Sequence, residues 1–299
     1  METTDFMGPL KHILLATDGS ASSDGAIKEA IYLSKSCTAR LSAVHVLETN
    51  PEFETEGLSF VEKMETSARE HLEAVRKEAA AQNVEVEVIV RRTDQPFKAI
   101  VEEAGRLKSD VIIMGRRGVS GLEKMLMGSV TAKVIGYAPC KVLVVPREAK
   151  ISCKNIMVAT DGSKYSSAAA TEALGIAKRC ESNLTVLAAV HSEALASMTP
   201  DTGYTQNQQE MIAKQEFERA EKNIAAIKAL ADKEGVSAEG VVAEGRPYEA
   251  IASAARDKNI DLIVVGSHGR TGLSKLLMGS VTERVIGHAD SAVLVVKVQ

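Results

Sequence analysis

Each half of the 299-residue chain carries glycines at one fixed spacing that suits the binding of an anion. A glycine, two residues, a second glycine, nine residues and a Gly-Ser pair occur at Gly115, Gly118 and Gly128-Ser129, and again at Gly266, Gly269 and Gly279-Ser280. Glycine lets backbone N–H groups approach a ligand closely because no side chain intervenes. A helix that begins at the Gly-Ser pair would add free N–H groups and the positive end of its dipole. The spacing predicts a polyphosphate cradle in each half, although the glycines could serve only as tight turns.

An aspartate follows a short apolar run in each half, in the segments Thr17-Asp18-Gly19-Ser20 and Thr160-Asp161-Gly162-Ser163. Asp or Ser at such a place commonly caps the following helix. We expect Ser20 and Ser163 to take the cap. The carboxylates of Asp18 and Asp161 would then be available to a ligand.

Two better-known phosphate motifs are absent from the sequence, the Walker loop G-x-x-x-x-G-K-[ST] and the dinucleotide fingerprint G-x-G-x-x-G. A hydride-transfer enzyme is therefore disfavoured. Efficient γ-phosphate hydrolysis usually needs a positioned Lys or Arg and a positioned water, and the cradle is expected to consist of backbone donors. We expect polyphosphate binding with at most slow hydrolysis and assign no catalytic residue. Arg116, Arg117 and Arg270 keep a weak ATPase as an alternative.

The two halves differ at the predicted cradle. The first half has Arg116-Arg117 where the second has Ser267-His268, and Asp94 where the second has Gly245. Two arginines beside a phosphate site could strengthen binding or fill the pocket.

Short β-branched runs alternate with helical patterns, and this alternation would position these residues. In the first half we expect strands over residues 12–17, 39–47, 85–90, 110–115 and 141–146, and helices over residues 20–36, 61–82, 96–107 and 129–137. Strands separated by helices form right-handed crossovers and a parallel sheet. Ligands of such sheets bind outside the carboxyl ends of the strands, where the strand order reverses. We predict an α/β fold with two tandem, doubly wound, Rossmann-like domains of five parallel strands each.

The halves are copies of one another. Residues 110–146 and 261–297 are identical at 21 of 37 aligned positions. We place the domains at residues 1–149 and 150–299. The second copy is eight residues longer between its motifs, and the extra residues fall most naturally in a loop over residues 194–209.

Composition narrows the classes of partner. The net charge is −4 and aromatic residues make up 3% of the chain with no Trp, which disfavours a nucleic-acid surface. No apolar stretch approaches the roughly 18 residues of a membrane span, and the N-terminus does not resemble a signal peptide. We expect a cytoplasmic protein with no membrane partner.

These motifs, together with the GRPYEAI segment at residues 245–251 and the closing VLVV runs, resemble the universal stress protein family, in particular tandem members of its ATP-binding branch. The resemblance implies a pocket in each half for ATP, ADP or AMP, with Mg²⁺ on the phosphates. It places Asp18 and Asp161 beside adenine and ribose and Val46 over the adenine, with Ala189 or Val190 as the counterpart of Val46. The implied contacts are Ala16, Thr17, Asp18, Val46, Met114, Gly115, Arg116, Gly118, Gly128, Ser129 and Val130, and then Ala159, Thr160, Asp161, Ala189, Val265, Gly266, Ser267, Gly269, Gly279, Ser280 and Val281.

The function that the resemblance implies is a nucleotide-dependent stress-response module. An alternative is a structural stress protein with empty pockets that assembles through its terminal strands. In the family that strand pairs across a twofold dimer. Here residues 142–145 and 293–296 can pair within one chain as a pseudo-dimer, and a homodimer of chains would use other surfaces.

Overall fold

The computed structural model describes residues 10–49, 58–118, 127–191, 205–270 and 278–298. The chain divides into two compact units. The first is built mainly from Met1–Ile151, and the second from Ser152–Ser274 and Gly279–Gln299. In both, strands alternate with helices along the chain, as the sequence predicts.

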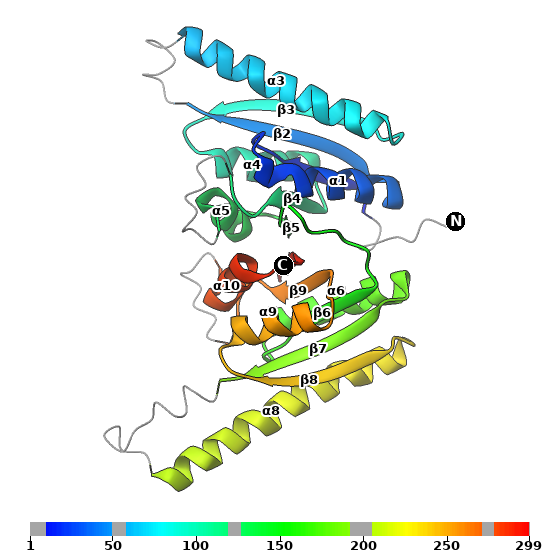
Figure 1. The fold of residues 1–299 in the computed structure, drawn as a ribbon, viewed down its shortest axis with the longest axis vertical. Coiled ribbons are helices and arrows are strands. Elements are labelled where there is room, and N and C mark those ends of the chain that lie inside the picture. Colours follow the sequence, from blue (N-terminus) through cyan, green and yellow to red (C-terminus); the bar gives the residue numbers. More distant parts are fainter. Residues whose placement is uncertain (1–9, 50–57, 119–126, 192–204, 271–277, 299) are drawn as a thin grey trace. The chain divides into compact units, whose positions relative to one another are not determined.

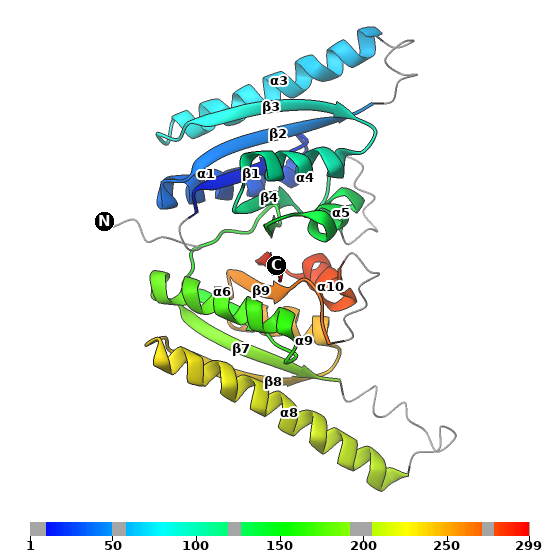
Figure 2. The same cartoon turned by 180° about the vertical axis from the view of Figure 1, so that it is seen from behind.

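The first unit is a parallel sheet of order β3-β2-β1-β4-β5 with helices on both faces. Figures 1 and 2 show α1 and α4 on opposite faces of this sheet. Its elements are β1 (His12–Ala16), the 3-10 turn η1 (Ala21–Ser23), α1 (Asp24–Cys37), β2 (Arg40–Glu48), α3 (Leu58–Ala80), β3 (Val86–Thr93), α4 (Pro96–Leu107), β4 (Val111–Gly115), α5 (Ser129–Tyr137) and β5 (Lys141–Val145).

The second unit repeats this plan with the order β10-β9-β6-β7-β8, again parallel. Helices α6 and α9 lie on opposite faces of its sheet (Figures 1 and 2). Its elements are β6 (Asn155–Ala159), α6 (Lys164–Cys180), β7 (Asn183–Val190), α8 (Gln206–Lys233), β8 (Ala238–Glu244), α9 (Pro247–Asp257), β9 (Leu262–Gly266), α10 (Ser280–His288) and β10 (Ala292–Val296).

The predicted α/β class is confirmed, although several boundaries differ from the expectation, and two of these differences have a local cause. The helix expected to start at residue 20 starts at Asp24, because residues 21–23 form the tighter 3-10 turn η1. The loop expected over residues 194–209 ends sooner, because Thr205 caps α8 through a reciprocal capping box with Gln208. Residues 194–204 lie outside the described part of the chain.

The central strands hold the core. Every residue of β1, β4, β9 and β10 is buried, as expected for a parallel sheet covered on both faces. Each fully buried Leu or Ile side chain contributes about 1.5–3 kcal/mol relative to exposure. Burial of these strands therefore fixes the positions of their carboxyl ends, and with them the residues that follow. Within the described residues, no helix is long and apolar enough to cross a membrane.

Candidate functional site

The predicted site residues of each unit gather where the strand order reverses. β1 pairs in parallel with both β2 and β4, so the turn after β1 and the loop after β4 begin side by side. The arrangement recurs around β6, which pairs with β7 and β9. Residues 17–20 and 160–163, which follow β1 and β6, are called the Asp turns below.

Backbone hydrogen bonds tie each Asp turn to the neighbouring strand. The Thr17 N–H donates to the Val44 carbonyl at 3.1 Å, and the Thr160 N–H donates to the Leu187 carbonyl at 2.8 Å. Val44 and Leu187 therefore occupy equivalent positions. Two residues farther along, Val46 corresponds to Ala189 rather than to Val190.

Both aspartates accept hydrogen bonds from their own turns. Asp18 Oδ1 accepts from the Ser20 N–H (3.1 Å), the Ser20 hydroxyl (2.7 Å) and the Ser23 hydroxyl (2.8 Å). Asp161 Oδ1 accepts from the Ser163 N–H (3.0 Å), while its Oδ2 accepts from the Arg270 N–H in the loop after β9 (2.8 Å). Burial raises the pKa of Asp161, but hydrogen bonds from Ser163, Ser166 and Arg270 outweigh burial and lower this pKa below its usual value.

The expected cap is confirmed in the second unit and wrong in the first. The Ser163 hydroxyl accepts a hydrogen bond from the Ser166 N–H at 3.2 Å and caps α6. The Ser20 hydroxyl instead donates to Asp18 and makes no cap bond. The 3-10 turn η1 intervenes before α1, so Ser20 does not stand at the start of that helix.

The second glycine of the spacing makes room for the aspartate. A Cβ added to Gly118 would lie 2.6 Å from Asp18 Oδ2, and one added to Gly269 would lie 2.9 Å from Asp161 Oδ2. Each carboxylate therefore rests against bare backbone of the loop after β4 or β9. Only glycine permits this approach without displacing the carboxylate.

The first glycine has a packing role. A Cβ on Gly115 would come within 2.6 Å of the Ser22 carbonyl oxygen, and one on Gly266 within 2.7 Å of the Tyr165 backbone. Close packing of the end of β4 against η1, and of the end of β9 against α6, thus requires glycine at both places. Gly115 and Gly266 therefore have a structural role, which lies in packing rather than in the tight turn that the sequence offered as the alternative.

The Gly-Ser pair begins a helix whose first turn is fixed to the strand end. The N–H of Gly128 donates to the Arg116 carbonyl (3.0 Å), and that of Gly279 donates to the Ser267 carbonyl (2.9 Å). The hydroxyls of Thr131 and Thr282 donate to the carbonyls at the ends of β4 and β9, at 3.2 and 2.8 Å. Helices α5 and α10 therefore start beside the Asp turns with first-turn N–H groups that have no partner inside the helix. The side chain of Val281 at this end is 39% exposed.

The loops after β4 and β9 differ in their side chains. Ser267 is buried, and its hydroxyl lies 3.1 Å from Nδ1 of His268, whose ring packs 5.2 Å from the ring of Tyr165. In the first unit, Arg117 has a buried Nε with no hydrogen-bond partner among the described residues.

The glycine spacing in the sequence did not identify two side chains that contact the Asp turns from helices α3 and α8. His71 of α3 places Nε2 2.9 Å from the Thr17 hydroxyl, and Asn223 of α8 lies 2.7 Å from where a Cβ on Gly162 would be. Helices α3 and α8 lie outside the repeated motifs. A usable signal existed for His71, because it falls on the helical stripe of buried Ala68, Leu72 and Val75.

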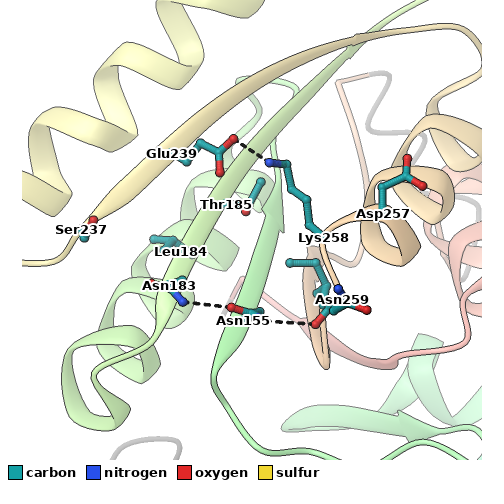
Figure 3. A pocket seen from close by; sticks show the side chains of 10 residues that line it. Asn155, Asn183, Leu184, Thr185, Ser237, Glu239, Asp257, Lys258 and Asn259 are labelled. Carbon is teal, nitrogen blue, oxygen red and sulfur yellow. Dashed lines mark hydrogen bonds and ion pairs between the residues drawn. The ribbon is translucent and has the colours of Figure 1, made fainter.

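A hollow of the second unit lies away from the Asp turns. A cavity of about 470 Å³ opens at the amino ends of β6, β7 and β8, opposite to the Asp turns (Figure 3). Its polar groups pair with one another, as the hydrogen bond from Asn183 to Asn155 (3.0 Å) and the ion pair of Lys258 with Glu239 (2.6 Å) show. This cavity contains none of the predicted nucleotide contacts.

Comparison with known proteins identifies the family. The model of the universal stress protein family matches residues 9–146 and 152–297. The chain is 37% identical over 145 residues to a universal stress protein of Methanocaldococcus jannaschii, covering 48% of this chain and 82% of that one. A second universal stress protein of that organism is 40% identical over 80 residues, covering 27% of this chain and 49% of that protein. A crystal structure of a universal stress protein from Archaeoglobus fulgidus shares the fold, with a TM-score of 0.71 over 96% of each chain at 21% identity. The chain, which carries the Asp turn and the spaced glycines twice, therefore belongs to the universal stress protein family.

Proposed function

We propose that the protein is a nucleotide-dependent stress-response regulator that binds one adenine nucleotide, ATP or its products ADP and AMP, in each unit. The observation that carries this proposal is the convergence, in both units, of an Asp turn, a glycine-bearing loop and a helix N-terminus at the reversal of strand order. Ligands of open α/β sheets bind at this place. The donor set fits a nucleotide, because backbone N–H groups suit phosphates and a carboxylate suits ribose hydroxyls.

Mg²⁺ would bind at this site only through the phosphates of a bound nucleotide. Among the described residues, no group of three or more His, Cys, Asp or Glu side chains could hold a metal ion. Mg²⁺ commonly keeps several waters and binds substrate phosphates rather than an all-protein cage. When bound, it would neutralise phosphate charge.

The chain's own groups favour binding over turnover. The first-turn N–H groups at Ser129 and Ser280 would hold the phosphates, and Asp18 and Asp161 would orient the ribose. Arg270 donates to Glu216 at 3.2 Å, so this guanidinium is already engaged. We propose slow hydrolysis at most, with Arg117 as the side chain that keeps a weak ATPase as the second candidate. The pseudo-dimer and any homodimer stay predictions from the sequence.

The test places a carboxylate at the second position of each candidate helix, in Val130→Glu and Val281→Glu. Acidic residues in a first turn usually favour the helix by about 0.3–1 kcal/mol, so folding should persist. Repulsion of the phosphates should lower ATP affinity at the altered unit by about tenfold or more. Mass spectrometry of ligand released by denaturation, followed by calorimetric titration, should find one nucleotide per unit in the parent, half as much in each single variant and none in the double variant.

Val298→Glu is the control, because Val298 has the same 39% exposure as Val281 but lies beyond β10. Its nucleotide content should equal that of the parent. Parent protein that carries no nucleotide and binds none with millimolar ATP and Mg²⁺ would favour the structural alternative. Phosphate release well above background would favour the ATPase.

A further inference from the structure

The two units differ in the side chains that support their Asp turns. Gly19 and Gly162 share nearly the same left-handed backbone, with φ of 75° and 77°. A Cβ on Gly19 would meet the His71 ring at 3.5 Å, whereas one on Gly162 would meet the Asn223 amide at 2.7 Å. The same place above the turn therefore holds an ionisable imidazole in the first unit and a neutral amide in the second.

A second histidine completes the first unit's cluster. His45 of β2 packs its ring edge-on against His71, with centroids 5.8 Å apart. Its Nδ1 is buried and has no hydrogen-bond partner among the described residues. The strand register gives Ala188 as the counterpart of His45, because Val44 corresponds to Leu187. The histidine pair is thus specific to the first unit.

The charges around the pair are few. Burial and the neighbouring His71 lower the pKa of His45, and Asp18 acts against them. Burial lowers the pKa of His71, against Asp18 of the turn and Asp24 of α1. Asp24 also lies 3.4 Å from Arg147. Farther along, Glu65 of α3 and Arg92 of β3 pair with each other.

We propose that His71 and His45 make nucleotide binding by the first unit proton-linked, through the hydrogen bond between the His71 ring and the Thr17 hydroxyl beside Asp18. The inference rests on the proposed nucleotide function and specifies how one of its two sites is regulated. His71 and His45 are positioning residues, which act through Thr17 and Asp18 rather than on the reacting groups. The first unit then binds nucleotide more tightly as the pH falls.

Linkage sets the direction of this effect. A nucleotide carries negative charge, and negative charge near an imidazole favours its protonated form. Both rings are half-buried, and burial already lowers their pKa, so the negative charge of the nucleotide is the main change that binding brings to them. Binding therefore takes up protons, and a site that takes up protons on binding gains affinity on acidification.

The second unit also has a histidine near its site, His268 in the loop after β9, so proton uptake by the two units must be measured separately. The experiment therefore uses a chain in which Val281→Glu weakens that site by about tenfold or more, so that the tighter binding phase with ATP and Mg²⁺ reports on the first unit. Calorimetry at about pH 8 and about pH 6, in two buffers of different ionisation enthalpy, gives both affinity and protons taken up. The terminal phosphate of ATP itself titrates near pH 6, so the decisive quantity is the difference between variants.

The matched variants are His71→Asn, which introduces the amide that Asn223 supplies in the second unit, and His45→Ala, which introduces the methyl side chain of Ala188. On going from about pH 8 to about pH 6, the ATP affinity of the Val281→Glu chain should rise by about fivefold or more relative to the same chain with His71→Asn. Proton uptake on binding should be smaller in both histidine variants than in the Val281→Glu chain. The reciprocal Asn223→His in the Val130→Glu chain should add proton uptake to the second unit. Equal pH responses of parent and both histidine variants would overturn the inference while leaving nucleotide binding intact. Absence of ATP binding at either pH would instead overturn the proposed function.

Discussion

At the residue scale, one contact recurs in both units while its surroundings change. The carboxylates of Asp18 and Asp161 rest against Gly118 and Gly269, although one Asp turn is bonded mainly by serine hydroxyls and the other by backbone N–H groups. The contact ties the end of the first strand to the loop after the fourth. It fixes the position of each carboxylate at the reversal of strand order.

Gly118→Ala and Gly269→Ala should test this contact directly. A methyl would overlap the Asp18 or Asp161 carboxylate, at 2.6 or 2.9 Å, and push it off its present position. We expect each variant to lose about tenfold or more in ATP affinity at its own unit, as calorimetric titration measures. Gly105→Ala is the control, because a Cβ on Gly105 in α4 meets nothing within 4 Å.

The control should bind nucleotide normally. It should also be more stable by about 0.5–1 kcal/mol, because alanine favours a helix over glycine. Unchanged ATP affinity in both Gly118→Ala and Gly269→Ala would show that Asp18 and Asp161 do not contribute to nucleotide binding.

At the element scale, two short helices are held in place by buried threonines. The Thr131 and Thr282 hydroxyls donate to the carbonyls of Gly115 and Gly266, which joins the first turns of α5 and α10 to the ends of β4 and β9. Both helices have nine residues, a length that is marginal for an isolated helix. Tertiary anchoring therefore sets where their N-termini lie.

Thr282→Val should separate this anchor from packing, because valine keeps the shape and removes the hydroxyl. The carbonyl of Gly266 would lose a donor in a buried setting, which costs about 1–3 kcal/mol. Urea denaturation should show this loss. Thr171→Val, at an exposed position of α6 where the hydroxyl donates to the Ser167 carbonyl at 3.2 Å, should change stability by less than about 0.5 kcal/mol. Equal losses in the two variants would contradict the anchoring role.

At the scale of the whole molecule, the units differ in their buried ionisable groups. In the first unit, His12 bridges the Leu107 carbonyl (3.1 Å) and the Ser42 hydroxyl (2.9 Å), and Ser42 donates to Glu87. Burial, followed by the charge of Arg40, lowers the pKa of His12. In the second unit, Asn155 begins the corresponding strand and lines the cavity of Figure 3.

Stability should therefore respond to pH differently in the two units. His12, His45 and His71 have folded pKa values below 6.5, so the unfolded chain binds more protons just below that pH. The first unit should lose stability as the pH falls through about 6.5 toward the folded values. The pKa of Asp161 is lowered, so its contribution to the stability of the second unit should be lost only below its ordinary value of 3.8.

Hydrogen exchange of β4 and β9 amides in nucleotide-free protein, corrected for intrinsic rates at about pH 7.5 and about pH 5.5, reports on each unit separately. Protection of β4 should fall more than that of β9, and His12→Asn should reduce the difference. A larger fall in β9 would contradict the assignment.

The sequence by itself determined the tandem α/β plan, the bounds of α4 and α5, and the residues of the two glycine spacings. These features are local or repeated, and periodicity and self-comparison detect them. Only the tertiary structure decided what supports each Asp turn, because His71 and Asn223 come from α3 and α8, outside the repeated motifs. It also decided that Ser20 bonds Asp18 rather than capping a helix, because that choice depends on the 3-10 turn and on the contact of Asp18 with Gly118, 100 residues away. Such contacts are set by how the strands align in the sheet, which pattern alone does not specify.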